Sequence, residues 1–221
     1  LAGGFIDWIF WAMRESTIQS RLVHVQVTRP DYFQVGSADP YGYLLQDLDE
    51  EKASITKLQG IKVLSPHLSF NGLIRHDDVT IGFIGEWVDP ELDSDLSKYL
   101  IVVAGEALES GYPDGLFMGR GLARNLDVTL GDTVALLATT ASGGLNGVEG
   151  TVRGLFQSAS KEFDDVTLRL PLDMARKLLR TSGSHSWLLL LDETEHTDRI
   201  LQQLQTQFPE SITGLQFTPW Y

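Results

Sequence analysis

Ser54 and Lys57 stand three residues apart in an S-x-x-K arrangement, which is the strongest candidate for catalysis in this chain. On a helix, this spacing places an amine one turn from a hydroxyl, where the amine could accept the hydroxyl proton and create a nucleophile. The surrounding segment 47–58 predicts a charged surface helix with an acidic start, and no S-D-N or K-T-G element accompanies it. We therefore predict that this pair is not catalytic.

Three groups of acidic residues and histidine could hold a metal ion. The His-Asp-Asp run at 76–78 consists of adjacent residues, whose side chains diverge, so we predict a solvated turn there. Acidic residues alternate at positions 47, 49 and 51 as in a calcium loop, but the glycine and the distant bidentate glutamate are missing, which indicates a helix start. Four carboxylates between 89 and 95 are typical of a solvated loop. We predict no metal and no cofactor.

Other catalytic signatures are absent from the sequence. There is no G-x-S-x-G elbow, no H-E-x-x-H zinc motif and no G-x-x-x-x-G-K-[ST] phosphate loop, and the chain contains no cysteine. These absences exclude a thiolate nucleophile and predict that the chain itself binds no ATP and is not an enzyme. A hydrolase whose polar groups converge only in the folded chain remains an alternative.

Composition and charge exclude further classes of function. The formal net charge of -13 argues against a nucleic-acid surface and against a broad basic face for anionic lipid. The content of 43% hydrophobic and 21% charged residues is that of an ordinary globular protein. Uninterrupted apolar runs such as 187–191 are far shorter than the roughly 20 residues of a membrane-spanning helix. We predict a folded domain that spans no membrane.

The segment 114–137 predicts a strand, a helix, a turn and a second strand in that order. Apolar residues recur at helical spacing at Leu122, Ala123 and Leu126. Gly119 and Gly121 permit close backbone approach where the first strand passes into the helix, and a glycine at 131 suits a turn with positive φ. This unit is structural and carries no catalytic chemistry.

On either side of this unit, the pattern predicts β-α-β units. The first consists of a strand at 21–28, a helix at 47–58 and a strand at 63–70. The second consists of strands at 166–170, 186–191 and 215–218 with helices at 172–180 and 195–208. Between them the chain is rich in glycine and strands, near 79–85, 99–103, 116–118, 133–138 and 150–155, with helix only at 121–126. The small residues at 139–147 predict a mobile hairpin tip or loop.

Both chain ends carry aromatic residues that suit a membrane interface. Segment 5–20 is apolar on more than one stripe and contains Trp8 and Trp11, while the chain ends in Pro-Trp220-Tyr221. An ordinary core helix at the start and an edge strand with a docked aromatic end are the alternatives. Because no initiator methionine or signal peptide is present, we infer a piece of a longer protein.

Five motifs follow one another with regular gaps. They are V-H-V-Q-V at 23–27, I-G-E-W-V-D-P-E at 84–91, G-x-x-L-A-x-x-L with L-G-D within 119–132, V-R-G-L-F at 152–156, and D…L-P-L…A-x-x-L-L within 164–179. In this order they resemble the extracytoplasmic core domains of MacB/LolC/LolE/FtsX-type ABC transporter permeases. Arg120 departs from the pattern, since an acidic residue often stands there, so no charged role is carried to that position.

The resemblance implies an α+β fold of two lobes. A discontinuous α/β lobe of β-α-β units, porter-like, would comprise residues 21–70 and 164–221, and an inserted, mainly β lobe, sabre-like, would comprise residues 71–163. Residues 1–20 would continue an upstream transmembrane helix. Trp8, Trp11, Trp220 and Tyr221 would then lie at the membrane interface.

The resemblance also implies a function. The chain would be the non-catalytic periplasmic domain of an inner-membrane permease that works with a cytoplasmic ATPase subunit, forms a dimer in the intact transporter, and engages a periplasmic adaptor or lipoprotein. Because exposed aromatics and flexible loops are common contact points, we predict partner binding at Tyr32, Phe33, Leu145 and Val148. The alternative is a free-standing periplasmic lipid- or peptide-binding or adaptor module.

Overall fold

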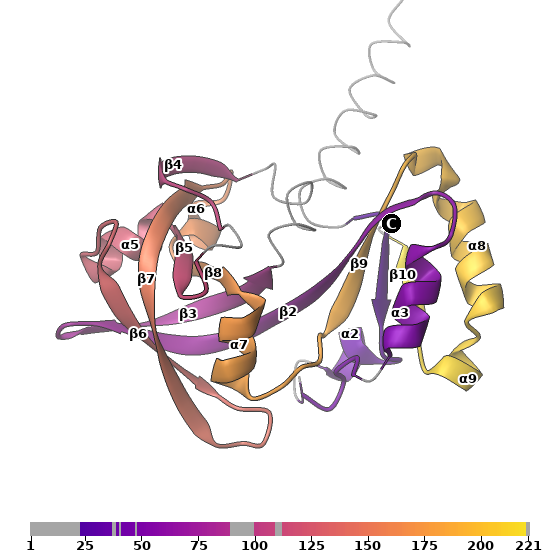
Figure 1. The fold of residues 1–221 in the computed structure, drawn as a ribbon, viewed down its shortest axis with the longest axis horizontal. Helices are drawn as coiled ribbons and strands as arrows, with labels where there is room; N and C mark the ends of the chain where they lie inside the picture. Colours follow the sequence, from indigo (N-terminus) through magenta and orange to yellow (C-terminus); the bar gives the residue numbers. More distant parts are fainter. Residues whose placement is uncertain are drawn as a thin grey trace, which may run out of the picture. The chain divides into compact units, whose positions relative to one another are not determined.

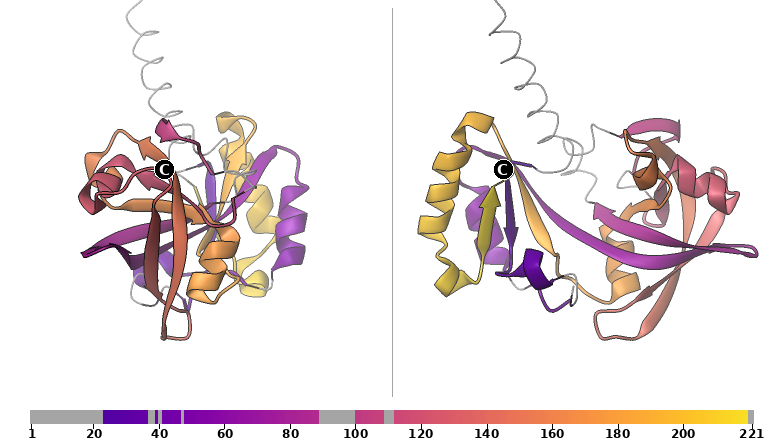
Figure 2. Two further views of the ribbon diagram at one scale, coloured as in Figure 1. Left: turned by 60° about the vertical axis from the view of Figure 1, so that its left-hand side comes forward. Right: turned by 180° about the vertical axis from the view of Figure 1, so that it is seen from behind.

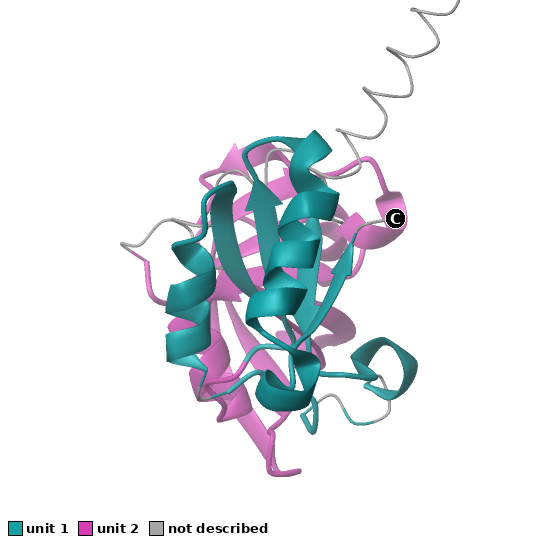
Figure 3. Ribbon diagram, turned by 90° about the vertical axis from the view of Figure 1, so that its right-hand side faces the viewer, with its two compact units in different colours: residues 1–66, 95–98, 184–221 teal, residues 67–94, 99–183 magenta. Residues whose placement is uncertain are grey.

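The computed structural model describes residues 23–36, 39, 41–46, 48–88, 100–108 and 112–219 (Figure 1). Trp8, Trp11, Trp220 and Tyr221, and the helix expected at 1–20, lie outside these residues. Within the described ranges, no helix is both long and apolar enough to cross a bilayer. The chain forms two compact units: unit 1 comprises residues 1–66, 95–98 and 184–221, and unit 2 comprises residues 67–94 and 99–183 (Figure 3).

Unit 1 contains a four-stranded sheet with the order β10-β1-β9-β2. The central strand β1 (Val25–Thr28) pairs antiparallel with β9 (Ser186–Leu191) on one side and with β10 (Gln216–Pro219) on the other. The strand β2 (Ile61–His76) contributes its first six residues to this unit. With the longer helices α3 (Asp49–Thr56) and α8 (Thr197–Gln207), this is the split β-α-β arrangement of ferredoxin-like folds.

The core of unit 1 lies between the sheet and these two helices, which Figure 3 shows in front of the strands. Alternate residues of the strands face the helices, so that Val25 and Val27 of β1 are buried with every second residue of β9. The helices bury Ile55, Ile200 and Leu204 against them. Three short helical turns complete the unit: α2 (Tyr32–Val35), η2 (Thr194–His196) and α9 (Glu210–Thr213).

Unit 2 is built on a closed ring of six strands. The pairing runs from β2 to β3 (Val79–Val88), β8 (Thr167–Pro171), β5 (Gly115–Gly119), β7 (Leu145–Gln157) and β6 (Thr133–Thr139), which pairs with β2 again. The pairs β3–β8 and β5–β7 are parallel, and the others are antiparallel. A closed ring leaves none of these six strands as a continuous free edge. A further strand, β4 (Ile101–Gly105), pairs with the end of β7 (Figure 2).

Large apolar side chains and small residues together fill the barrel. Ile74, Leu116, Met118, Leu136 and Leu168 are fully buried. Gly85 and Gly150 make room for them: a Cβ on Gly85 would lie 2.4 Å from the Phe70 ring, and a Cβ on Gly150 would lie 2.7 Å from Met174. Three helices pack around the strands, namely α5 (Arg120–Leu126), α6 (Lys161–Asp164) and α7 (Leu172–Leu179).

The structure changes several expectations about element lengths and boundaries. Residues 164–183 were expected in the discontinuous lobe, but they belong to unit 2 because β8 pairs with β3 and β5. The strand expected at 63–70 is the longer β2, Ile61–His76, and the strand expected at 150–155 is part of the longer β7, Leu145–Gln157. The expected helix at 195–208 begins as the 3-10 turn η2, and α6 is a second helix in the central region.

Candidate contact surfaces

The candidate catalytic and metal-binding residues that the structure describes lie in the local structures that the sequence predicted for them. Ser54 is exposed on α3 and Lys57 is exposed at its end, as predicted for a surface helix. The 76–78 run forms the turn between β2 and β3, where Asp77 has a φ of 49° and both aspartates are exposed. No group of three metal-ligating side chains occurs in the ranges that the structure describes. Asp47 and the carboxylates of 89–95 lie outside those ranges.

Leu145 and Val148 lie in the β6–β7 hairpin, but on opposite faces of it. Leu145 is 74% exposed and pairs with Thr139. Val148 is half-buried and shares its face with the buried residues Gly150 and Val152. One surface therefore cannot contain both residues, and we keep Leu145 alone as a candidate for partner contact.

The tip of this hairpin is held by hydrogen bonds. The Thr140 N–H donates to the Gly144 carbonyl at 2.7 Å, and the Thr140 hydroxyl accepts from the Gly144 N–H at 3.1 Å. The Asn146 amide donates to the carbonyls of Lys177 and Leu178 at 2.8 and 3.0 Å, at the end of α7. The predicted hairpin is therefore confirmed, and α7 anchors its base.

An apolar patch that the sequence did not reveal lies on the outer face of β3, β2, β6 and β7. Leu73 is 49% exposed and pairs with Leu137 on one side and Gly82 on the other, while Leu137 also pairs with Gly147. Nothing lies within 4 Å of a Cβ placed on Gly82. The two leucines therefore stand in a flat row bordered by glycines. We call the row, with the exposed neighbours Ile84 and Leu145, the outer patch.

The two aromatic residues predicted to contact a partner occupy different environments in α2. Tyr32 stacks on His185 with 5.6 Å between ring centroids, and its partial burial raises the pKa of its hydroxyl. Phe33 is 54% exposed. Only Phe33 therefore presents most of its ring to solvent.

Close packing explains the two glycines at the start of α5. A Cβ on Gly119 would lie 2.2 Å from the Asp164 carbonyl oxygen, and a Cβ on Gly121 would lie 1.9 Å from an Asp165 carboxylate oxygen. Only glycine therefore lets β5 and α5 approach the end of α6. This confirms the predicted close approach at the change from strand to helix.

The turn after α5 also has the predicted geometry. Gly131 has a φ of 91°. The Asp132 carboxylate accepts hydrogen bonds from the Thr129 N–H at 2.7 Å and the Thr129 hydroxyl at 3.0 Å. These bonds hold the pKa of Asp132 below its ordinary value because they favour the charged carboxylate. The turn leads directly into β6.

No protein-family model and no curated protein sequence matches this chain, but solved structures do. The extracellular domain of the noncanonic ABC-type transporter YknZ from Gram-positive bacteria matches with a TM-score of 0.62 at 12% identity, over 88% of this chain and 98% of that chain. The periplasmic region of MacB from Actinobacillus actinomycetemcomitans matches with a TM-score of 0.60 at 12% identity, over 89% and 88%. The chain has the fold of these extracytoplasmic ABC transporter domains. The likeness spans both units and nearly the whole of each solved domain.

Two of the five motifs of the sequence resemblance lie in α5, in the turn before β6 and in α7. The G-x-x-L-A-x-x-L motif spans the end of β5 and the whole of α5, and the L-G-D motif is the turn before β6. The A-x-x-L-L residues Ala175, Leu178 and Leu179 are the buried face of α7. These two motifs therefore specify packing and backbone geometry in unit 2.

Proposed function

We propose that this chain is the non-catalytic extracytoplasmic domain of an ABC transporter permease subunit. The observation that carries the proposal is the likeness to the YknZ and MacB domains, which covers 88% and 89% of the chain. The order of the five motifs supports the same conclusion. Units 1 and 2 would be the porter-like and sabre-like lobes of that family.

In this proposal, the domain transmits a change of conformation and performs no chemistry. A separate cytoplasmic subunit hydrolyses ATP, and membrane helices next to the domain transmit the change to it. A transporter has two states of similar free energy, and the nucleotide shifts the balance between them because it binds one state more tightly. Two copies of the domain would stand side by side in the intact transporter, on the outer side of the cytoplasmic membrane.

We assign partner engagement, with a periplasmic adaptor or a lipoprotein, to the outer patch of unit 2 and to Phe33 of unit 1. Exposed apolar residues that gather on one face commonly mark protein contacts, and the patch contains Leu73, Ile84 and Leu145 at 49, 38 and 74% exposure. The row is flat because Gly82 and Gly147 carry no side chain. A flat apolar surface with a rigid sheet behind it loses little entropy when a partner binds.

The two hairpin residues give a matched test of this assignment. Leu145→Arg is expected to leave the melting temperature of the chain within about 2 °C, because the side chain is already in solvent. Val148→Arg is expected to lower the free energy of unfolding by about 2 kcal/mol, because it places a charge on the face that contains Gly150 and Val152. Thermal and urea unfolding measure both effects. Equal destabilisation by the two changes would contradict the assignment of faces.

Partner contact can be tested by photo-crosslinking in intact cells. A photoreactive residue at position 145 of the full-length protein is expected to give a crosslink to a second protein, and Leu73→Arg, in the same patch, is expected to remove it. The control position for the photoreactive residue is Ile212, which is at least as exposed as Leu145, at 80%, but lies on α9 of unit 1 and is not part of the outer patch. Equal crosslinking from 145 and 212 would show that exposure alone determines the contacts.

The location of the domain is tested by cysteine labelling, since the chain has no cysteine of its own. The full-length protein, freed of other cysteines and carrying Ile212→Cys, is expected to react with a membrane-impermeant maleimide in intact spheroplasts and to remain in the membrane fraction. Labelling only after lysis would contradict an extracytoplasmic location. A labelled protein that leaves the membrane without detergent would favour the free-standing lipid- or peptide-binding module.

A further inference from the structure

A polar recess lies in unit 2 where β7 ends and α5 begins. Its volume is about 400 Å³, and its charged and amide-bearing walls are formed by Arg120, Arg124, Gln157, Lys161, Asp164 and Asp165. These residues come from α5, from the last residue of β7, and from α6 and the residue that directly follows it. Among these charged residues only Asp164 is a defining residue of one of the five motifs, and none of them is a predicted contact residue.

The charges of the recess have the opposite balance to the charge of the whole chain. Three cationic side chains stand against two carboxylates, although the chain carries a formal net charge of -13. Asp164 is 7% exposed, and its carboxylate accepts a hydrogen bond from the Ser158 N–H at 2.9 Å. This carboxylate is therefore directed toward the protein, and the solvent side of the recess is predominantly basic.

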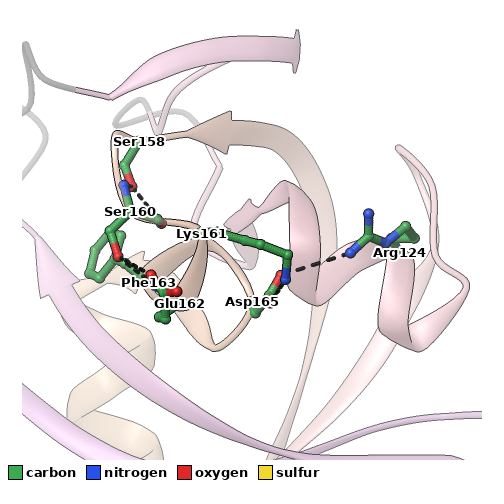
Figure 4. Close-up of polar contacts among 7 residues, drawn as sticks. All are labelled: Arg124, Ser158, Ser160, Lys161, Glu162, Phe163 and Asp165. Carbon is green, nitrogen blue, oxygen red and sulfur yellow. Dashed lines mark hydrogen bonds and ion pairs between the residues drawn. The ribbon is translucent and has the colours of Figure 1, made fainter.

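Asp165 positions two of the cations (Figure 4). Its carboxylate forms an ion pair with Lys161 and lies 3.9 Å from the Arg124 guanidinium, so the two cations approach it from α6 and α5. The Asp165 side chain is 24% exposed, whereas both cationic side chains are 70% exposed. A separation of 3.9 Å is too long for a hydrogen bond, so the donor groups of Arg124 remain available to a ligand.

Two further residues complete the arrangement. Gly121 lets Asp165 reach α5, because a Cβ there would lie 1.9 Å from the Asp165 carboxylate oxygen. Arg120 is exposed and forms no ion pair with the residues that the structure describes. The recess therefore presents Arg120, which pairs with none of the described carboxylates, together with two cations that share the Asp165 carboxylate as an ion-pair partner.

We propose that this recess binds a phosphate group through Arg120, Arg124 and Lys161. An arginine offers parallel N–H donors that match two oxygens of a phosphate, and a lysine adds a point charge. Three cations against two carboxylates leave a net positive charge around the recess, which fits a group with several charged oxygens. The group could belong to free phosphate or to a phospholipid headgroup, and the test separates these sources.

The primary test is a titration of the 15N-labelled 221-residue chain with inorganic phosphate at constant ionic strength, followed by NMR. Saturable shifts are expected at the amides of 120–124 and 157–165. Arg120→Gln and Arg124→Gln are each expected to weaken binding by about fivefold or more, because each removes a charge-assisted hydrogen bond. Lys177→Gln is the matched control, since it removes an exposed charge from another helix of unit 2, and it is expected to bind normally.

The second arm is flotation with vesicles of phosphatidylglycerol and of phosphatidylcholine. Flotation with phosphatidylglycerol that depends on Arg120 and Arg124 identifies a lipid headgroup, whereas phosphate binding without flotation identifies a soluble anion. The proposal is overturned if phosphate produces no saturable shift, or if the arginine variants bind as tightly as Lys177→Gln. Thermal melting shows that each variant is folded. This outcome is independent of the proposed transporter function, which the labelling experiment tests separately.

Discussion

Glu86→Gln is expected to lower the free energy of unfolding by about 3 kcal/mol, because it removes the negative charge that pairs with the buried Arg169 guanidinium at Glu86. The two side chains form an ion pair at 3.1 Å, and their exposures are only 11% and 7%. They stand opposite each other in the parallel pair β3–β8. Adjacent residues of both strands face the barrel core, so the ion pair lies on the outer side, where α5 packs against β3.

An exposed ion pair provides the control that separates the effect of burial from the effect of losing a charge. Asp173→Asn breaks the exposed pair between Asp173 and Arg176 at 3.5 Å and is expected to cost less than about 1 kcal/mol, because solvent screens both groups. Replacing Glu86 and Arg169 together by methionine is expected to recover part of the loss, since the buried guanidinium is then removed together with its Glu86 partner. Urea unfolding measures all three variants. A loss from Glu86→Gln no larger than that from Asp173→Asn would show that the Glu86 pair contributes little.

Gly119→Ala is expected to destabilise the chain by about 3 kcal/mol, at the upper end of the usual cost of overpacking. Gly119 has φ and ψ of -60° and 134°, which alanine adopts without strain, so any loss must come from contact. The added Cβ would lie 2.2 Å from the Asp164 carbonyl oxygen, and a backbone atom cannot rotate away. The start of α5 and the end of α6 would have to separate.

Gly82→Ala provides the control for this prediction. Gly82 also lies in a strand, but nothing stands within 4 Å of its Cβ position. Its substitution is expected to change the free energy of unfolding by no more than about 0.5 kcal/mol. If both variants lose the same stability, the close approach at Gly119 is not what constrains this position.

Local sequence patterns predicted the helices and turns of this fold better than they predicted which strands pair with one another. The helix at α5 and the turn at Gly131 follow from apolar spacing and glycine placement, and both occur as predicted. The membership of β8 in unit 2 could not be predicted, because its pairing with β3 joins segments some 83 residues apart in register. Strand pairing over such separations depends on the whole barrel, and the local sequence of Thr167–Pro171 does not specify it.

The candidate contact surfaces were predictable only where exposure follows from a turn. Leu145 follows the Gly143-Gly144 turn and is exposed as expected, but Val148 faces the core because its position in the strand alternation depends on where β7 starts. The outer patch was not visible in the sequence, since Leu73 and Leu137 are 64 residues apart and meet only through the β2–β6 pairing. The Arg120 recess likewise joins α5 to α6 through tertiary contact.

The proposed coupling links nucleotide binding in the cytoplasm to a change of conformation in this domain, on the outer side of the membrane. It is tested most directly by measuring electron–electron distances in the full-length transporter, reconstituted with its ATPase and spin-labelled at Ser142→Cys, an exposed position in a chain without cysteine. The account predicts one distance distribution between the two copies without nucleotide and a different one with bound ATP. Identical distributions in both states would contradict it.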